Sequence, residues 1–517
     1  MKTLRAPAWR LSPGHLSAAV PGGLTKPGQT VLKRDIREFR YVSEIQVGSR
    51  GKSAMSKTTL SLAVNGREHQ LKGRMVLFEM PGTESGATSV AGLLNGNGAT
   101  TWSAAIVGLG YVGLPTAAAL QGRCGRIIGL DANQGRLREI MAGEADLGEP
   151  DRIRLDAALS DGSLELTCDP AAVAKADAVI ICVPTPVDGD YVPDLGALRG
   201  ACASVVAHAR PGQTLILTST TYAGTTRELL AEPLERRGLR VGSDVFVAFS
   251  PERIDPGNPD HLQRETPRVV GGVTPECASR AAAVIGQLTD EVYLVSSPEA
   301  AEATKLYENI FRAVSLALAN EFADACGALG LDPVEVTLAA GTKPYGFLGA
   351  LPGPGVGGHC IPCDPHYLLW QLGRKGRRSP LIEQAMTSIR LRPGRVAERA
   401  REVLAAGGRG LAGARVIVVG VSYKAGVQDL RESPALPLIA GLLAEGAEVS
   451  YCDPLIPCIQ LPDGIQMRSE NAPAGSGWDL AVVHTLHPGV DHSWVRDCPR
   501  VLDATYQLSG VSHRVVV

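Results

Sequence analysis

Short apolar runs that end in glycine or polar residues recur along most of the chain. Between residues 100 and 260 these runs are SAAIVGLG, RIIGLD, ADAVIICVPTP, QTLILTSTTYAGTT and DVFVAFSPERIDPGN. Runs that are apolar throughout are typical of strands buried on both faces of a parallel sheet. The same pattern returns in ARVIVVGVSYKAG and EVSYCDP, which flank the helical segment ALPLIAGLLAEG. The sequence therefore predicts two α/β units, one on each side of a central region.

The central region has a helical period. Residues 298–330 form PEAAEATKLYENIFRAVSLALANEFADACGALG, in which apolar side chains recur every four residues at Leu306, Ile310, Val314, Leu318 and Phe322. We expect one long helix there, and a helix of this length also suits pairing of two subunits. Lys305 and Asn309 lie four residues apart, so they share one face beside the apolar stripe. That arrangement suggests donors for an anionic intermediate, whereas a lone lysine on a helix is usually a solvated charge.

These patterns predict an α/β fold with two Rossmann-like domains joined by a long central helical region. We place the first domain at 101–296, the central domain with the cysteine loop at 297–400 and the last domain at 401–517. Residues 1–100 differ in composition and include the linker-like GTESGATSVAGLLNGNGAT, so we expect a flexible or poorly ordered extension. Within that extension, TTLSLAV (58–64) has the alternation of a strand. We assign the extension no function.

Composition narrows the class of protein. A net charge of −2 gives no electrostatic footprint for nucleic acid or an anionic membrane, and no apolar run is long enough to span a bilayer. The eleven cysteines are scattered through the chain and several lie inside apolar runs, which is typical of a reducing compartment. We therefore predict a cytoplasmic protein whose partners include neither nucleic acid nor a membrane.

The first domain opens on a phosphate-binding pattern. The segment AAIVGLGYVGLPTAAALQG has G-x-G-x-x-G at Gly108, Gly110 and Gly113, between an apolar run and an Ala-rich helix. These glycines would permit a tight turn, close approach of a pyrophosphate and packing of helix on strand, and the helix N-terminus favours phosphate. Asp131 follows Gly113 by 18 residues, where an acid accepts ribose hydroxyls and repels a 2′-phosphate. The cofactor predicted is NAD, and the remaining residues assigned to its site here are Tyr111, Val112 and Arg136.

Three later runs end in polar side chains. Thr185, Thr220 and Glu252 each follow an apolar run, and ligands of parallel sheets bind beyond the carboxyl ends of the strands. We expect all three residues to face one crevice and Thr185 and Thr220 to contact NAD there, although threonines at such positions also commonly cap turns.

The segment GPGVGGHCIPCDPHYLLW (353–370) has three interpretations. His359, Cys360, Cys363 and His366 could bind zinc, but four ligands so close together do not easily close a tetrahedron. Cys360 and Cys363 could form a redox dithiol, but the strand that usually precedes such a motif is missing. Cys360 alone could be a nucleophile: Gly357 and Gly358 would admit substrate, the helix start at CDPHYLLW would lower the thiol pKa, and Asp364 would lie near the sulfur.

The chain resembles the UDP-glucose/GDP-mannose dehydrogenase family, the nucleotide-sugar 6-dehydrogenases. Eight segments in family order carry the resemblance, and they are GLGYVGLP, CVPTPVDGDYVPDL, STTYAGTT, FSPERIDPGNP, PRVVGG, AEATKLYENIFRAV, GPGVGGHCIPCDPHYL and GVSYKAGVQDLRESPAL. The resemblance implies oxidation of a sugar C6 alcohol to a carboxylate with two NAD⁺, through a thiohemiacetal and then a thioester on Cys360. It also implies a UDP-sugar substrate and a homodimer or higher homo-oligomer.

The resemblance further implies roles for individual residues. Lys305 and Asn309 would stabilise the oxyanion, Asp364 and Thr220 would position the proton shuttle and water, and Glu252 would act in thioester hydrolysis. The expected substrate contacts are Glu252, Arg253, Lys305, Asn309, Gly357 and Lys424, and Arg431 is expected to reach NAD. No metal is expected.

The sequence departs from the family pattern at four positions. Pro256 stands where UDP-glucose-type members carry a second Glu, and Cys363 stands where that branch has Lys. Thr218 and Ala223 also differ from many relatives. The role of that second Glu is therefore not carried over to the loop after Glu252, and no lysine contact with the cofactor is carried over to Cys363.

Several substrates and activities stay open at this stage. The form GPG-x-GGHCIP-x-DP resembles the branch that acts on UDP-N-acetylhexosamines, which favours UDP-N-acetylglucosamine, with UDP-glucose and UDP-N-acetylmannosamine as alternatives. Two other activities are a two-electron hydroxyacid dehydrogenase with Lys305 as base and a non-catalytic protein that binds NAD or a nucleotide sugar. The first would not depend on Cys360, and the second would bind cofactor without turnover.

Overall fold

The computed structural model describes residues 36–45, 56–64, 67–74, 101–253, 263–471 and 473–517. The chain divides into two units. The first unit includes an antiparallel sheet of β1 (Ile36–Ile45), β2 (Ser56–Val64) and β3 (Arg67–Arg74), with β2 in the middle, and most of helix α9 (Pro333–Gly341). The strand expected in TTLSLAV is confirmed as part of β2. The rest of residues 1–100 lies outside the described residues, so the flexible extension stays a prediction.

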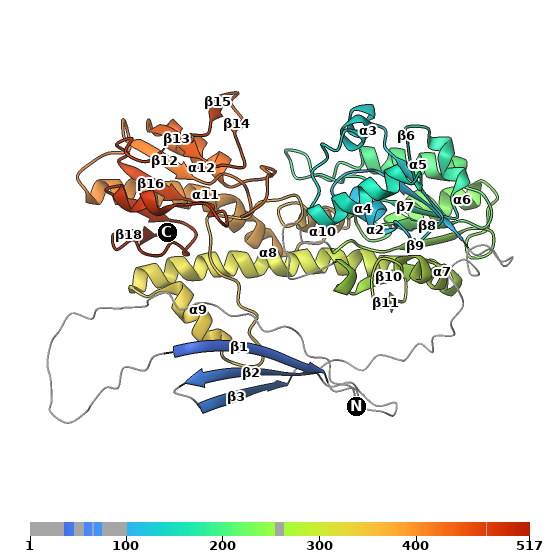
Figure 1. Ribbon diagram of the computed structural model, residues 1–517, viewed down its shortest axis with the longest axis horizontal. Coiled ribbons are helices and arrows are strands. Elements are labelled where there is room, and N and C mark those ends of the chain that lie inside the picture. Colours follow the sequence, from blue (N-terminus) through green and yellow to red (C-terminus); the bar gives the residue numbers. More distant parts are fainter. Residues whose placement is uncertain (1–35, 46–55, 65–66, 75–100, 254–262, 472) are drawn as a thin grey trace. The chain divides into compact units, whose positions relative to one another are not determined.

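The second unit begins with a large, mostly parallel sheet (Figure 1). Its strands are β4 (Ser103–Val107), β5 (Arg126–Leu130), β6 (Leu164–Thr167), β7 (Ala178–Ile181), β8 (Thr214–Leu217), β9 (Phe246–Phe249), β10 (Arg268–Gly272) and β11 (Val292–Val295). They lie in the order β11-β10-β9-β8-β7-β4-β5-β6, parallel except where β10 pairs with β9. The strand order reverses between β4 and β7, which is where ligands bind in open α/β sheets.

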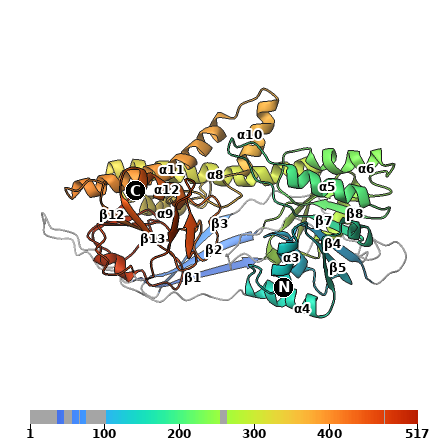
Figure 2. The same cartoon turned by 90° about the horizontal axis from the view of Figure 1, so that it is seen from above.

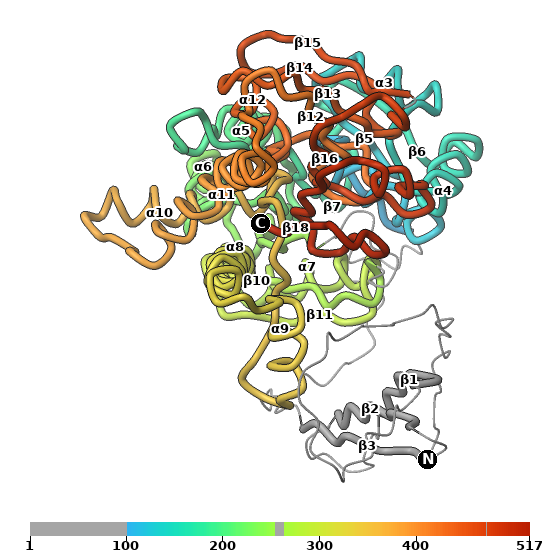
Figure 3. The backbone as a smooth tube through the Cα atoms, turned by 90° about the vertical axis from the view of Figure 1, so that its left-hand side faces the viewer, coloured from blue at the N-terminus to red at the C-terminus, as the bar shows by residue number. Residues whose placement is uncertain are grey.

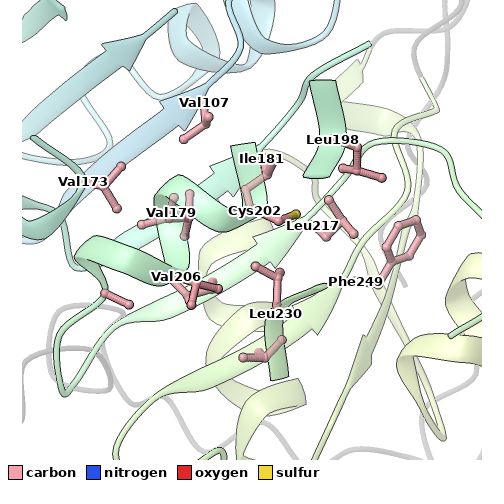
Figure 4. Packing of buried hydrophobic residues seen from close by; sticks show 14 of the residues in the cluster. Val107, Val173, Val179, Ile181, Leu198, Cys202, Val206, Leu217, Leu230 and Phe249 are labelled. Atoms are coloured by element: carbon pink, nitrogen blue, oxygen red, sulfur yellow. The ribbon is translucent and has the colours of Figure 1, made fainter. Parts of the chain in front are cut away.

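Helices cover both faces of this sheet because its strands are apolar on both sides. Ala105 and Val107 of β4 belong to one core cluster, while Ala104 and Ile106 belong to the other. Figure 4 shows part of the first cluster, which includes Val107, Ile181, Leu198 and Cys202. The helices and helical turns of this domain are α2 (Gly113–Ala119), α3 (Gln134–Met141), α4 (Glu149–Ser160), η1 (Pro170–Lys175), α5 (Gly196–His208), η2 (Arg227–Ala231), α6 (Glu232–Arg236), η3 (Gln263–Glu265) and α7 (Pro275–Ile285).

The predicted long helix is confirmed as α8 (Pro298–Leu329). Ser297 caps its start by accepting the N–H of Ala300 at 3.2 Å, and Gly330 ends it in the left-handed conformation at φ +71°. Helices α10 (Asp364–Arg374) and α11 (Pro380–Ala406) pack on it. Figure 2 shows α11 beside α8, and Figure 3 views α8 end-on.

The apolar stripe expected along α8 is only partly buried. Leu306 and Ile310 are buried, but Leu318 is 64% exposed and Phe322 is 43% exposed. A step of four residues turns an α-helix about 40° past one full turn, so a strict four-residue row winds around the helix. The buried row instead combines steps of three and four residues, and it includes Asn309, Ala313 and Ala317 among other side chains.

The last domain is a second parallel sheet without the glycine fingerprint, as predicted. Its strands lie in the order β13-β12-β16-β17-β18, and α11 supplies Val396, Ala400 and Leu404 to its core. The boundary expected at residues 400/401 therefore falls inside α11. The elements of this domain are β12 (Arg415–Val419), α12 (Ala435–Ala444), β13 (Glu448–Cys452), β14 (Cys458–Gln460), β15 (Gln466–Arg468), β16 (Leu480–Val483), η4 (Ser493–Asp497), β17 (Val501–Asp503) and β18 (Arg514–Val516).

Candidate active site

The three fingerprint glycines have the distinct environments that a dinucleotide cradle needs. Gly108 follows β4 with φ +89°, and a Cβ there would lie 2.9 Å from the carbonyl oxygen of Cys182. A Cβ on Gly113 would lie 1.8 Å from the carbonyl oxygen of Gly108, so α2 can pack on the strand only with glycine at that position. A Cβ on Gly110 would meet no atom within 4 Å, which leaves its backbone open to a ligand. The cradle therefore fits the pyrophosphate of NAD.

Asp131 and Arg136 hold this cradle through the same backbone residue. The Asp131 carboxylate accepts the N–H of Leu109 at 2.8 Å, and Arg136 Nε donates to the Leu109 carbonyl at 2.9 Å. Asp131 follows the carboxyl end of β5, beside β4. An acid at this position suits ribose hydroxyls, as the sequence predicted, and the structure adds that it orders the glycine loop.

Lys305 on α8 reaches the loop that follows β9. Its Nζ donates to the backbone carbonyl of Glu252 at 3.0 Å. The Glu252 carboxylate forms an ion pair with Arg268 of β10, with Oε2 and Nη1 2.6 Å apart, and both side chains are buried. Arg268 lies in PRVVGG, a segment that the sequence marked as a family motif without giving this residue a role. A buried carboxylate beside a buried guanidinium is therefore a structural anchor of the site.

Asn309 lies one turn after Lys305 and meets the start of α10. Its side-chain amide donates to the Asp364 carboxylate, and both residues are buried. Burial raises the pKa of Asp364 to about 6, although the Lys305 charge and the Asn309 hydrogen bond both lower it. A carboxyl group with that pKa exchanges its proton near neutral pH, as a proton shuttle requires.

Cys360 precedes α10 and is half-buried. Its carbonyl accepts the N–H of Asp364 at 2.8 Å, which confirms the predicted helix start. The expected lowering of the thiol pKa was wrong: burial and the Asp364 charge raise the pKa of Cys360, and they outweigh Lys305, Arg312 and Arg431. The sulfur precedes the helix by four residues, outside the first turn where the helix field acts. His359, considered from the sequence only as a candidate zinc ligand, places Nε2 3.6 Å from Sγ.

The glycines before Cys360 pack against the last domain. A Cβ on Gly357 would lie 2.6 Å from Cβ of Tyr423 and 2.8 Å from the carbonyl oxygen of Glu432. Gly358 has φ +80°, with the ring of Tyr423 at a similar distance. Within the protein, the close neighbour of these glycines is thus the loop that contains Tyr423 and Glu432. Contact of Gly357 with substrate stays a prediction.

Arg431 and Tyr111 connect the last domain to the cofactor loop. The Arg431 guanidinium lies over the Tyr111 ring, 4.3 Å from its centroid, and its Nη2 forms an ion pair with Asp429 Oδ2 at 2.6 Å. Val112 is the N-cap residue of α2, directly after Tyr111. Residues more than three hundred positions apart in the sequence are thus brought to one edge of the predicted NAD site.

The loop that carries Lys424 is fixed by two buried side chains. Asp453 accepts the N–H groups of Val421 and Ser422 at 2.7 and 3.1 Å, and His487 Nδ1 accepts the N–H of Gly426 at 3.0 Å. Lys424 lines a cavity of about 160 Å³ between this loop and residues 352–355. The predicted substrate lysine therefore stands on an ordered backbone beside an open space.

The remaining predicted site residues lie at the carboxyl ends of adjacent parallel strands. Thr185 follows β7, and its carbonyl accepts the Tyr367 hydroxyl at 3.0 Å. Thr220 follows β8 and is half-buried. Arg253 follows β9, but its guanidinium binds Glu308 and the Pro267 carbonyl, so its contact with substrate stays a prediction. Pro256 and Asp255 lie outside the described residues.

Glu302 is a site residue that the sequence reasoning missed. Its buried carboxylate accepts from the N–H of Gly224 at 2.5 Å and from Thr226, which holds the loop containing Thr220. Burial raises the pKa of Glu302 to about 7. The position of Glu302 in the sequence could have identified it, because it lies four residues before Leu306 on the buried face of α8. An unpaired charge on that face would be costly, so the carboxylate needs a partner.

The described part of the chain has neither a cluster of metal ligands nor a membrane-spanning helix. Over these residues, no group of three or more His, Cys, Asp or Glu side chains is arranged to hold a metal ion. None of the helices with described residues is long and apolar enough to cross a membrane.

Comparison with known proteins covers all three domains. Residues 103–310 match the NAD binding domain of the UDP-glucose/GDP-mannose dehydrogenase family, residues 299–388 match its central domain and residues 417–507 match its UDP binding domain. The predicted NAD cofactor is thereby confirmed.

Individual relatives agree with the domain matches. The chain is 32% identical over 412 residues to the UDP-N-acetyl-D-glucosamine 6-dehydrogenase of Pseudomonas aeruginosa, covering 78% of this chain and 96% of the relative. It is 35% identical over 352 residues to the UDP-N-acetyl-D-mannosamine dehydrogenase of Escherichia coli K12, covering 66% of this chain and 82% of the relative. The solved structure of the UDP-D-ManNAc dehydrogenase of Pyrococcus horikoshii matches with a TM-score of 0.73 at 30% identity. The match covers 80% of this chain and 98% of that chain. The chain therefore belongs to the UDP-glucose/GDP-mannose dehydrogenase family and is an NAD-dependent oxidoreductase that acts on a UDP-sugar.

Proposed function

We propose that this enzyme oxidises the C6 alcohol of a UDP-N-acetylhexosamine to a carboxylate in two two-electron steps, through covalent intermediates on Cys360. The observation that carries the proposal is the convergence of Cys360, Lys305, Asn309 and Asp364, which α8 and the start of α10 bring together. Gly108, Gly110 and Gly113 would hold two NAD⁺ molecules one after the other, and each would accept one hydride. All other steps below belong to residues of the chain.

The hydrogen-bond donors and the proton carrier of the site are proposed to act on the C6 oxygen of the substrate. In this proposal Lys305 and Asn309 donate to the substrate C6 oxygen as negative charge develops on it. Asp364 exchanges the proton of that oxygen, directly or through a water positioned by Thr220. The hydrogen bond of Asn309 to Asp364 supports this division, because it joins the oxyanion donor to the proton carrier.

The thiol enters after the first oxidation. Cys360 Sγ forms a bond with the aldehyde carbon while its proton passes to a neighbouring base, which gives the thiohemiacetal. Loss of two further electrons converts this to a thioester, and water then cleaves the C–S bond to release the carboxylate and the free thiol. The raised pKa of Cys360 supports a thiol that stays protonated until the aldehyde arrives. Glu252 is proposed to assist the attacking water.

The first candidate substrate is UDP-N-acetylglucosamine, because the sequence of residues 353–365 resembles that of the branch acting on UDP-N-acetylhexosamines. UDP-N-acetylmannosamine is the second, because relatives with that name reach 35% identity. A panel of UDP-N-acetylglucosamine, UDP-N-acetylmannosamine and UDP-glucose with NADH readout separates them. The true substrate should yield two NADH per sugar, and a yield of one would contradict the thioester step.

Substitution of the thiol tests the covalent route. Cys360→Ala should abolish formation of the acid, while Cys363→Ala, the matched control three residues away, should keep it. Mass spectrometry of Cys360→Ser or of wild type quenched during turnover should locate any substrate adduct at residue 360. Unchanged acid formation in Cys360→Ala would refute the nucleophile.

We also propose a homodimer that forms through α8. Large apolar side chains stay exposed along this helix at Tyr307, Phe311, Leu318, Phe322 and Leu329. Their spacings of four, seven, four and seven residues are those of a helix face that packs along a partner.

All eleven cysteines are free, which supports our proposal that the enzyme works in the reducing cytoplasm.

A further inference from the structure

A buried histidine lines the cavity beside Lys424. The cavity, about 160 Å³ in volume, lies between residues 352–355 of the cysteine loop and the last domain, and His484, Thr485 and Gln507 contribute to its wall. His484 follows the carboxyl end of β16 and is only 3% exposed. Its Nε2 has no hydrogen-bond partner among the residues that the structure describes. Buried polar atoms are rarely left unpaired, so this nitrogen calls for an explanation.

The hydrogen bonds around His484 determine which nitrogen carries the proton. The Thr485 hydroxyl donates to the carbonyl of Ser422 at 2.8 Å, so its single proton is already used. His484 Nδ1 lies 2.9 Å from the same hydroxyl oxygen and must therefore be the donor. Burial lowers the pKa of His484 to about 4, so the ring is neutral at pH 7. With the proton on Nδ1, Nε2 presents a bare lone pair, which is a hydrogen-bond acceptor.

His484 and Lys424 both line this cavity, and an acceptor and a cation recognise different parts of a nucleotide sugar. Lys424 suits the phosphate oxygens, which only accept hydrogen bonds. Those oxygens have no proton to donate to Nε2 of His484. This nitrogen needs a donor such as an imide N–H of the base or a hydroxyl of a sugar. The two side chains are therefore complementary to a ligand that carries both phosphates and donors.

We propose that His484 is a substrate-binding residue, whose Nε2 accepts a hydrogen bond from an N–H or O–H group of the UDP-sugar bound beside Lys424. This inference rests on the proposed function and adds to it a residue that reads the nucleotide sugar. The donor belongs to the nucleoside or to the hexose, and the chemistry required of it is the same in both cases.

The test measures binding without turnover, by calorimetric titration of the purified full chain with UDP and with UDP-N-acetylglucosamine. His484→Leu removes the acceptor and should weaken binding of the nucleotide sugar about tenfold, the factor expected for one hydrogen bond. His484→Gln, which can place an oxygen near the position of Nε2, should bind within about threefold of wild type. The affinity for NADH should be unchanged in both variants, because the cofactor cradle lies in the other domain.

The two ligands identify the source of the donor. An equal loss for UDP and for UDP-N-acetylglucosamine assigns it to the nucleoside, and a loss for UDP-N-acetylglucosamine alone assigns it to the hexose. If His484→Leu does not fold, His484→Met removes the acceptor with a side chain that fills irregular gaps. The proposal is overturned if wild type binds and the acceptor-free variant binds within twofold of it, or if His484→Gln loses as much as His484→Leu. Wild type that binds neither ligand would contradict the proposed function instead.

Discussion

The side-chain amide of Asn309 donates to the buried carboxylate of Asp364, and this contact joins the middle of α8 to the first residue of α10. Burial raises the pKa of Asp364 to about 6. If the carboxylate form acts as the proton carrier, kcat/KM of wild type should rise as pH increases through about 6. Asp364→Asn should lose that limb of the profile along with most of the activity, as initial rates between pH 5 and 9 will show.

The same shift affects stability. Because the pKa of Asp364 is higher in the folded state than its usual 3.8, the folded protein holds the proton more tightly. Its contribution is fully present below pH 4 and is lost as pH rises through about 6. Asp364→Asn should therefore gain stability relative to wild type between pH 4 and 8, by up to about 3 kcal/mol. Urea unfolding at the two pH values measures the change, and a difference that does not depend on pH would contradict the shift.

Two glycine substitutions should separate folding from cofactor binding. Gly110→Ala meets no atom within 4 Å, so it should keep the melting temperature of wild type while weakening NAD binding by occupying the cradle. Gly113→Ala forces a Cβ to 1.8 Å from a backbone oxygen and should lower both the melting temperature and the affinity. Thermal unfolding with NADH fluorescence titration checks both. Normal NADH affinity in Gly110→Ala would place the pyrophosphate elsewhere.

The stacked pair of Arg431 and Tyr111 should contribute to NAD affinity. An exposed cation–π contact is worth about 0.5–1 kcal/mol, so Tyr111→Ala and Arg431→Ala should each weaken NADH binding by at least about twofold to fivefold. Tyr111→Phe keeps the ring and is the matched control. The double variant should lose less than the product of the single losses, and strictly multiplicative effects would show that the two side chains act independently.

The buried ion pair of Glu252 and Arg268 should make the free energy of unfolding sensitive to the loss of either partner. Removing one partner leaves a charge buried without compensation, so Glu252→Gln should destabilise the protein by about 3–5 kcal/mol. Replacing both, as Glu252→Gln with Arg268→Met, should recover much of that loss. Denaturant unfolding at pH 7 measures the three variants. An unaltered midpoint for Glu252→Gln would mean that the pair is not buried in solution.

Charges on the exposed face of α8 should dissociate the proposed dimer. Leu318→Glu with Phe322→Glu places two carboxylates among apolar side chains and should yield monomers by light scattering at micromolar concentration. Leu381→Glu, on the neighbouring helix and 69% exposed, is the control that should leave the assembly unchanged. A double variant that keeps the mass of wild type would exclude this face as the interface.

The sequence by itself determined the elements and the candidate residues of the site. Apolar runs that end in glycine predict buried parallel strands, because both the strand and its turn depend on local residues. The fingerprint glycines and the long helix followed from the same local rules. Lys305 and Asn309 could be paired from their spacing, since a helix fixes which residues share a face.

Tertiary structure alone decided the environment of each group. The thiol pKa of Cys360 depends on burial and on Asp364, Lys305 and Arg431, which sequence spacing does not weigh against one another. The ion pair of Glu252 with Arg268 depends on neighbours from other strands and loops, and so does the His484 nitrogen, which has no hydrogen-bond partner among the described residues. Electrostatic energies vary with distance and burial in three dimensions, so they become known only when the chain is folded.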